Sequence, residues 1–184
     1  MAKPYGFSLT KSGDIRIRLE DSERDLLLSL ARQVAEFVAP TAADPNEDPL
    51  AAMVGIDATA EMPDDPALAR LFPDAFKDDP EASAEFRRFT ERGLREAKFA
   101  NASLVISALE LDAPTIPRDD VGAWLGFLND TRLTLGTRLE ISEDNHDELA
   151  ALPGDDPRLG LFHIYDWLTY LQDTLVRALL PHAS

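Results

Sequence analysis

Cysteine is absent from the 184 residues, which excludes disulfides, thiol catalysis and cysteine-ligated metal sites. Long apolar runs are also missing, because no stretch approaches the roughly 20 residues that a transmembrane helix needs. The first residues, Met1 to Tyr5, lack the basic segment followed by an apolar one that marks a secretory signal. We therefore expect a cytoplasmic protein that does not use a membrane.

Motifs of the common enzyme classes are missing too. The chain has no glycine-rich phosphate loop, no Gly-x-Ser-x-Gly nucleophile elbow and no dinucleotide-binding fingerprint. Its three histidines, His146, His163 and His182, do not have the spacing of a zinc site. A single histidine in an apolar helix, such as His163, is more often a core or interface residue than a catalytic one. The sequence predicts no catalytic residue, no metal ligand and no cofactor, and we expect no enzymatic activity.

Positive charge is scarce, with 18 Lys and Arg against 34 Asp and Glu, which gives a formal net charge of -16. A surface of this sign repels phosphate, so nonspecific nucleic-acid binding by the whole surface is disfavoured. Hydrophobic residues make up 45% of the chain, which is too many for a disordered chain. We expect one globular domain, residues 1–184, that folds without disulfide or metal support.

The spacing of apolar residues predicts a mainly α protein. Alternation over residues 7–19, around a turn at Ser12-Gly13, predicts a small N-terminal β-hairpin. Helical spacing predicts an N-terminal helix over residues 22–38 and a short helix after Ser142. It also predicts three long helices, over residues 81–111, 121–139 and 158–180. We expect these three to form a bundle, with the N-terminal helix packed across it.

Residues 40–66 are acidic and proline-rich and contain no Lys or Arg, which predicts a loose connection with one short helix. A connection of this length is either functional or a poorly ordered loop, and the second reading is favoured. Asp-Pro steps supply a cap and a first-turn proline, so they predict helix starts rather than metal ligands. Four of these steps stand immediately before an apolar helical pattern: Asp48-Pro49, Asp65-Pro66, Asp79-Pro80 and Asp156-Pro157.

The helix over residues 81–111 has two contrasting faces. Its predicted buried stripe, against which another helix must pack closely, comprises Phe86, Phe89, Gly93, Ala97, Ala100, Leu104, Ala108 and Leu111. The opposite side carries the only cationic stretch of the chain, Arg87, Arg88, Arg92, Arg95 and Lys98. This candidate interaction face suits an acidic partner or phosphate. The alternative is a solvated helix surface, because Glu91 and Glu96 dilute the charge and can pair with it.

A second polar group interrupts the apolar pattern of the last two long helices. Arg132 lies near the edge of an apolar stripe, and Asp166 or Asp173 is the natural partner for its guanidinium. We expect an interhelical ion pair rather than a proton-handling carboxylate, because no nucleophile or base accompanies it. The candidate structural polar cluster comprises Asn129, Asp130, Arg132, Asp166 and Asp173.

The last helix is apolar on nearly all sides, so it is either central to its domain or shared with a partner. Together with the helix that contains Trp124, it carries more apolar surface than a small bundle can bury. We therefore expect a homodimer formed through one of these two helices.

Four segments stand out as a set: Arg70-Leu71-Phe72-Pro73-Asp74-Ala75-Phe76, Glu85-Phe86-Arg87-Arg88-Phe89-Thr90-Glu91, Trp124-Leu125 with Leu128-Asn129-Asp130-Thr131-Arg132-Leu133, and Tyr165-Asp166-Trp167-Leu168-Thr169-Tyr170-Leu171-Gln172. With them the chain resembles, over nearly its whole length, an actinobacterial family of small cytoplasmic proteins classed as a domain of unknown function. The resemblance implies a bacterial protein, often encoded beside the adaptor of the Clp protease, with some members labelled transcriptional regulators. It brings no catalytic residues. A thiol switch attributed to relatives cannot operate in a chain without cysteine.

The sequence thus favours a non-enzymatic regulatory protein that acts through protein contacts, with transcription machinery as the class of partner. The first alternative is a DNA-binding regulator that uses the Arg87 to Lys98 face, extended by Arg16 and Arg18. The net charge makes direct DNA binding an unfavoured expectation. The remaining alternative, an enzyme or metal site, requires Asp130, Asp166 and His163 to converge.

Overall fold

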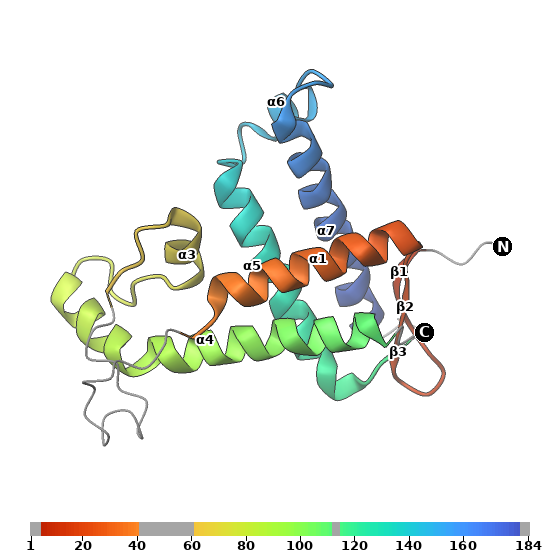
Figure 1. Cartoon of the computed structure of the whole chain (residues 1–184), viewed down its shortest axis with the longest axis horizontal. Helices are drawn as coiled ribbons and strands as arrows, with labels where there is room; N and C mark the ends of the chain where they lie inside the picture. The colour runs from red at the N-terminus through yellow and green to blue at the C-terminus, as the bar shows by residue number, and fades with distance from the viewer. Residues whose placement is uncertain (1–4, 41–60, 112–114, 181–184) are drawn as a thin grey trace.

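The computed structural model describes residues 5–40, 61–111 and 115–180 (Figure 1). Its elements are β1 (Gly6–Leu9), β2 (Ile15–Arg18), α1 (Asp21–Val38), α3 (Pro66–Leu71), α4 (Pro80–Glu110), β3 (Thr115–Ile116), a 3-10 turn (Arg118–Asp120), α5 (Val121–Arg138), α6 (His146–Ala150) and α7 (Pro157–Leu179). The fold is mainly α, as predicted. The short helix expected in the 40–66 connection and the Asp48-Pro49 step fall on residues 41–60, outside the described residues.

The predicted hairpin is present and has a third strand beside it. β1 pairs antiparallel with β2, so that Phe7 lies opposite Ile17, and the chain turns at Gly13 with a φ of +94°. β2 also pairs with β3, which places Ile15 opposite Ile116. Phe7, Ile15 and Ile116 are buried, so the sheet covers one end of the helical core. Alternation cannot reveal β3, because a strand of two residues has no measurable period.

Helix starts follow the predicted capping chemistry. The carboxylates of Asp65, Asp79 and Asp156 each accept a hydrogen bond from a first-turn backbone N–H, at 2.8 Å in α3 and 2.9 Å in α4 and α7. A proline follows each of them in the first turn. α1 begins one residue before the predicted start at residue 22, and its cap is Glu20, whose N–H donates to the Glu23 carboxylate at 2.7 Å.

The long helices meet around one aromatic centre. α1 lies along α4, while α5 and α7 lie side by side and rise away from them toward α6 (Figure 1). Trp124 of α5 is 1% exposed, and its ring meets that of Phe7 edge-on at 5.7 Å. A smaller apolar cluster at the far end of α5 and α7 comprises Leu139, Leu149 and Phe162.

Among the described helices, none has the length and apolar composition that crossing a bilayer requires.

The predicted inner face of α4 is wrong for its N-terminal half. Phe86 and Phe89 are 48% and 55% exposed; at the other end of the predicted stripe Leu111, which follows α4, is 80% exposed. The buried residues of α4 are Ser83, Arg87, Glu91, Arg95, Ala102, Val105 and Leu109. The N-terminal turns of α4 extend past the end of α1, next to α3 (Figure 1), and among the described residues there the buried line Ser83, Arg87, Glu91 and Arg95 faces the segment that contains Phe72 and Phe76. That line carries paired charges, which apolar periodicity cannot recognise as buried.

Candidate interaction surface

Three charged residues, spaced one helical turn apart, form a buried ladder on α4. Glu91 accepts a hydrogen bond from Arg87 Nη1 at 2.6 Å and another from Arg95 Nε at 2.9 Å, each through a different carboxylate oxygen. The side chains of Arg87, Glu91 and Arg95 are 6%, 9% and 11% exposed. A spacing of four residues puts them on one helix face, so local geometry alone aligns the two pairs.

The ladder fixes the segment that joins α3 to α4. Arg87 Nη2 donates to the Phe72 carbonyl oxygen at 3.0 Å and to Asp74 Oδ1 at 2.9 Å, and the Arg95 guanidinium lies 4.4 Å from the centre of the Phe72 ring. Burial by itself lowers the pKa of Arg87, but the hydrogen bonds to Glu91 and Asp74 outweigh this effect, so the pKa is raised overall. Arg87 and Arg95 thus both have partners inside the protein.

Lys98 also turns inward, although the sequence groups it with the candidate interaction face. Its Nζ donates to Asp130 Oδ1 of α5 at 2.6 Å, and the two side chains are 15% and 4% exposed. Burial raises the pKa of Asp130, and the hydrogen bond from Lys98 opposes that shift. Because both residues are occupied with each other, neither is available to a ligand.

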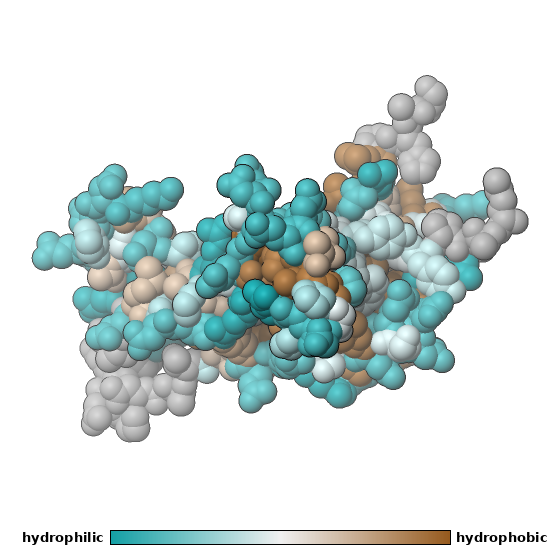
Figure 2. Space-filling view, turned by 90° about the horizontal axis from the view of Figure 1, so that it is seen from above, coloured by the Kyte–Doolittle hydropathy of each residue, from teal (hydrophilic) through white to brown (hydrophobic). Residues whose placement is uncertain are grey.

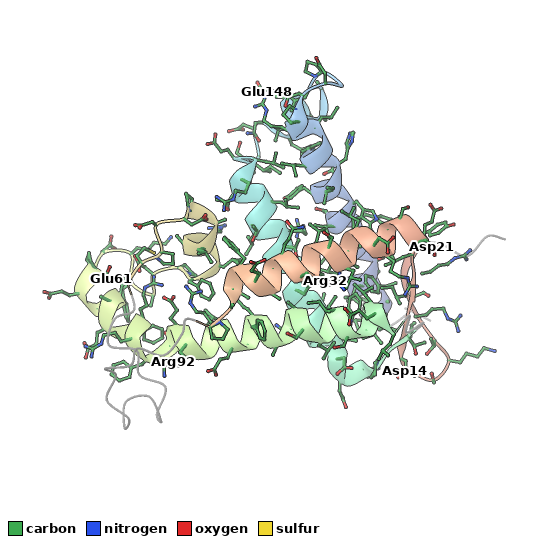
Figure 3. All side chains as sticks on the ribbon, in the orientation of Figure 1. Asp14, Asp21, Arg32, Glu61, Arg92 and Glu148 are labelled. Carbon is green, nitrogen blue, oxygen red and sulfur yellow. The ribbon has the colours of Figure 1, made fainter. Side chains whose placement is uncertain are left out.

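The candidate interaction face presents fewer cations to solvent than the sequence suggests, and an apolar strip is exposed beside it. Two of its five cations remain at the surface: Arg88 is exposed and Arg92 is half-buried. Both belong to the N-terminal half of α4, where Figure 3 labels Arg92. Around the helix from them lies an exposed apolar strip, here called the outer face of α4. It comprises Phe86, Phe89, Gly93, Ala97 and Ala100.

A groove adjoins the outer face of α4. It has a volume of about 530 Å³ and lies between α4 and the segment that follows α3, with Phe72, Pro73, Phe86 and Leu94 among its lining residues. The Phe76 and Phe86 rings meet edge-on at 6.1 Å on this side of the molecule. Exposed apolar surface occurs elsewhere too, since the face seen from above has a hydrophobic area between hydrophilic side chains near its middle (Figure 2).

The predicted ion pair of Arg132 does not form. Arg132 instead donates to three neutral acceptors of α7, the Thr169 hydroxyl at 2.9 Å, the Gln172 amide oxygen at 2.6 Å and the Tyr165 hydroxyl at 3.5 Å. Residues 165, 169 and 172 share the α7 face that meets α5, whereas the two expected acids lie about 100° further around the helix. The sequence pattern placed the partners of Arg132 on the correct helix, but the predicted acids lie one position after the observed acceptors Tyr165 and Gln172.

The other members of the candidate structural polar cluster are dispersed. Asp166 lies 3.2 Å from His146 Nε2, and Asp173 pairs with Arg177 at 2.7 Å on the exposed side of α7. Asn129 and His163 are exposed. Asp130, Asp166 and His163 therefore do not converge. No group of three or more His, Cys, Asp or Glu suited to a metal ion occurs within residues 5–40, 61–111 and 115–180.

Comparison with known proteins places this architecture in a family. The model of the family described as "Domain of unknown function (DUF2017)" matches residues 4–179. The "Oxidative stress regulator AosR" of Mycobacterium bovis and that of Mycobacterium tuberculosis are each 33% identical to the chain over 183 residues, covering 90% of this chain and 82% of the relative. The "Putative oxidative stress regulator AosR" of Mycobacterium leprae is 34% identical over 151 residues, covering 72% of this chain and 67% of the relative. No solved structure gives a significant match. The chain belongs to the DUF2017 family, whose name assigns no function.

Proposed function

We propose that this protein is a non-enzymatic regulator of an oxidative-stress response and that it acts by binding a protein of the transcription machinery. The names of the mycobacterial relatives support the regulatory role. The 184 residues contain no cysteine, so no thiol of these residues can sense an oxidant. Regulation in this proposal therefore depends on contacts rather than on covalent chemistry of the protein itself.

The proposed partner-binding surface is the outer face of α4. Two aromatic rings, Phe86 and Phe89, are about half exposed on a helix that buries Arg87, Glu91 and Arg95. Exposed aromatic residues that adjoin a groove are typical of protein-binding surfaces. Gly93, Ala97 and Ala100 follow the rings along the same face, and their small side chains allow a second helix to approach closely.

Charge narrows the class of partner. Arg88 lies exposed beside Phe89, in a protein whose net charge is -16. A partner helix that presents apolar residues to the outer face and carboxylates to Arg88 complements both properties of this surface. We therefore propose an amphipathic, acidic helix as the docking element of the partner.

Homodimer formation is a separate part of the proposal and uses a different surface. Trp124 is inside one subunit, which makes α5 a poor dimer surface, but α7 leaves Tyr170 and Val176 46% and 42% exposed. A dimer through α7 leaves the outer face of α4 free for the partner. The two contacts can therefore be tested independently.

The experiment compares two variants in one background. The double variant Phe86→Ser/Phe89→Ser removes the aromatic rings of α4, and Val176→Ser removes an exposed apolar side chain of α7. Each is expressed, tagged, in a host strain that lacks the gene. We expect the α4 variant to lose the transcription proteins that co-purify with the wild type and to fail to restore resistance to hydrogen peroxide. We expect Val176→Ser to keep both properties but to shift toward monomer in sedimentation velocity.

The opposite pattern decides against the proposal. If the folded α4 variant, checked by circular dichroism, retains the same transcription proteins and restores peroxide resistance, the outer face of α4 is not the regulatory contact. If Val176→Ser and the wild type are both monomeric at micromolar concentration, the dimer part of the proposal fails alone.

A further inference from the structure

A cleft of about 420 Å³ lies on a different side of α5 from the Lys98–Asp130 pair. Residues of α3, α5, the segment after α5 and α7 line it, among them Arg70, Arg132 and Tyr165. Its volume falls in the range of small-molecule sites, about 300–1,000 Å³. Three of the four segments that stand out in the sequence contribute to this one cleft.

Arg132 is positioned in the cleft without a counter-ion. Its three acceptors on α7, Thr169, Gln172 and Tyr165, are all neutral, and no carboxylate of the described residues pairs with it. A guanidinium has five N–H donors in a rigid fork, so these three bonds fix its plane and leave two donors unused. Tyr165 adds a ring 5.4 Å below the guanidinium carbon. The result is an oriented cation rather than a neutralised one.

Arg70 brings a second positive charge to the same cleft. It is exposed, near the end of α3, and among the described residues it has neither a hydrogen bond nor an ion pair. Other arginines of this acidic chain do have carboxylate partners, as Arg87 has in Glu91 and Arg138 has in Asp65. Two cationic side chains without a described carboxylate partner at one cleft point to a ligand that supplies the negative charge.

We propose that this cleft binds a small organic anion that bears a carboxylate or phosphate group, with the anionic group held between Arg132 and Arg70. The planar fork of arginine matches the geometry of both groups. Leu133, Ile141 and the Tyr165 ring form the apolar part of the wall, which suits the carbon portion of the ligand. Asn129 at the rim can donate a further hydrogen bond from its amide.

The net charge of -16 does not prevent such binding. The Debye length is about 8 Å at 0.15 M salt, so acids on distant parts of the surface are largely screened at the cleft. Glu140 is the acid that lines the cleft itself, and it opposes an anion. Removal of this carboxylate should therefore strengthen anion binding, and the direction of that change tests the proposal.

Isothermal titration calorimetry with three probes tests the proposal at constant ionic strength. The probes are phenyl phosphate, benzoate and inorganic phosphate, which separate the two anionic groups and the contribution of a ring. We expect saturable binding of at least one ring-bearing anion, weakened about tenfold or more by Arg132→Gln or Arg70→Gln, as loss of a charge-assisted hydrogen bond implies. We expect Glu140→Gln to tighten it.

Arg16→Gln is the matched control. Arg16 is exposed on β2, far along the chain from the cleft, and its replacement changes the net charge by the same amount. Loss of binding in all three arginine variants alike, or absence of saturable heat for every probe, overturns the proposal. If Arg132→Gln does not fold, Arg70→Gln decides the matter, because Arg70 has no described side-chain partner. The proposed contact of α4 is unaffected by either outcome.

Discussion

Lys98 Nζ lies 2.6 Å from Asp130 Oδ1, and this nearly buried pair joins the two long helices α4 and α5. A charge in such a place is stable only while its partner is present, because desolvation of an unpaired ion is costly. The sequence grouped Lys98 with a surface patch and Asp130 with a polar cluster of α5 and α7. The observed pair assigns both residues to the packing of α4 against α5 instead.

Replacement of Lys98 alone should destabilise the fold strongly. Lys98→Met leaves the Asp130 carboxylate buried without a partner, and breaking a buried pair in this way costs about 3–5 kcal/mol of unfolding free energy. The double variant Lys98→Met/Asp130→Leu removes both charges and should recover most of that loss. Urea unfolding of the wild type, the two single variants and the double variant measures the coupling. Additive effects of the two substitutions would show that the pair has no energetic role.

Among the described aspartates with shifted pKa values, Asp130 should lose its proton at a higher pH than Asp65 and Asp156. Burial raises the pKa of Asp130, with Lys98 opposing the shift, whereas hydrogen bonds from Arg138 and Arg158 lower the pKa of Asp65 and Asp156. Carboxyl-carbon NMR across pH 2–7 (roughly the range spanning model Asp values) should show Asp130 deprotonating at the highest pH of the three. If it titrates with or below Asp65, Asp130 is more hydrated than its burial indicates.

The same shifts have opposite effects on stability. Because the pKa of Asp130 is raised on folding, its contribution to unfolding free energy is complete below its unfolded pKa and is lost as the pH rises through its folded pKa. The contribution of Asp65, whose pKa is lowered, is complete above its unfolded pKa and is lost as the pH falls through its folded pKa. We expect Asp130→Asn to flatten the stability profile on the high-pH side of the acid range. Asp65→Asn should flatten it on the low-pH side.

Glu91 should be the most sensitive residue of the ladder. Glu91→Gln leaves Arg87 and Arg95 without the carboxylate they share, so we expect a loss of about 3 kcal/mol or more. The matched control is Asp173→Asn, which breaks the exposed pair with Arg177 and should change stability by less than about 1 kcal/mol. Thermal and urea unfolding measure both. Equal effects of the two substitutions would mean that the ladder is as hydrated as a surface pair.

Gly126 tests how closely α4 and α5 approach. A Cβ at position 126 would lie 2.7 Å from Asn101 Nδ2, so Gly126→Ala alone forces the Asn101 side chain to move. In an Asn101→Ala background that conflict disappears, and the same substitution should gain up to about 1 kcal/mol from helix propensity. Gly93→Ala, which meets no atom within 4 Å, is the control for propensity alone. An equal gain from Gly126→Ala in both backgrounds would exclude a close contact.

Local chemistry made much of the fold predictable, whereas the choice of buried face was not. The Asp-Pro caps at Asp65, Asp79 and Asp156 act through neighbouring atoms, so the sequence is sufficient to identify them. The apolar strip that contains Phe86 is regular enough to predict a helix, but nothing local indicates which face other elements cover. The four-residue spacing of Arg87, Glu91 and Arg95 is the signal that permits a buried ladder, and solvated surface helices carry the same spacing.

For the candidate site, too, local features could be predicted from the sequence, whereas tertiary contacts could not. The sequence singled out Arg132 as a guanidinium that needs an acid of α7, but its acceptors there depend on the rotation of that helix, and a shift of one residue replaces Asp166 and Asp173 with Tyr165 and Gln172. Arg70 stands in one of the four segments that support the family resemblance, but nothing in the sequence marked it as a binding residue, because a single arginine at the end of a short helix looks like any surface residue. Tertiary contact between α3 and α5 is what brings it to the cleft.

The last prediction is that the purified protein does not bind duplex DNA appreciably at physiological salt. Of the five cations that a DNA-binding surface on α4 requires, Arg87, Arg95 and Lys98 are held by internal carboxylates, Arg92 is half-buried and Arg88 is exposed. So small an exposed set of cations releases few counterions, and the net charge of -16 acts against it. Fluorescence anisotropy with random and promoter duplexes at about 150 mM salt should give no binding tighter than the nonspecific range of about 10⁻⁴–10⁻⁶ M. Submicromolar binding that weakens in the Arg88→Ala/Arg92→Ala variant would instead establish a DNA-binding regulator, because only a local patch strong enough to overcome the overall field produces that combination.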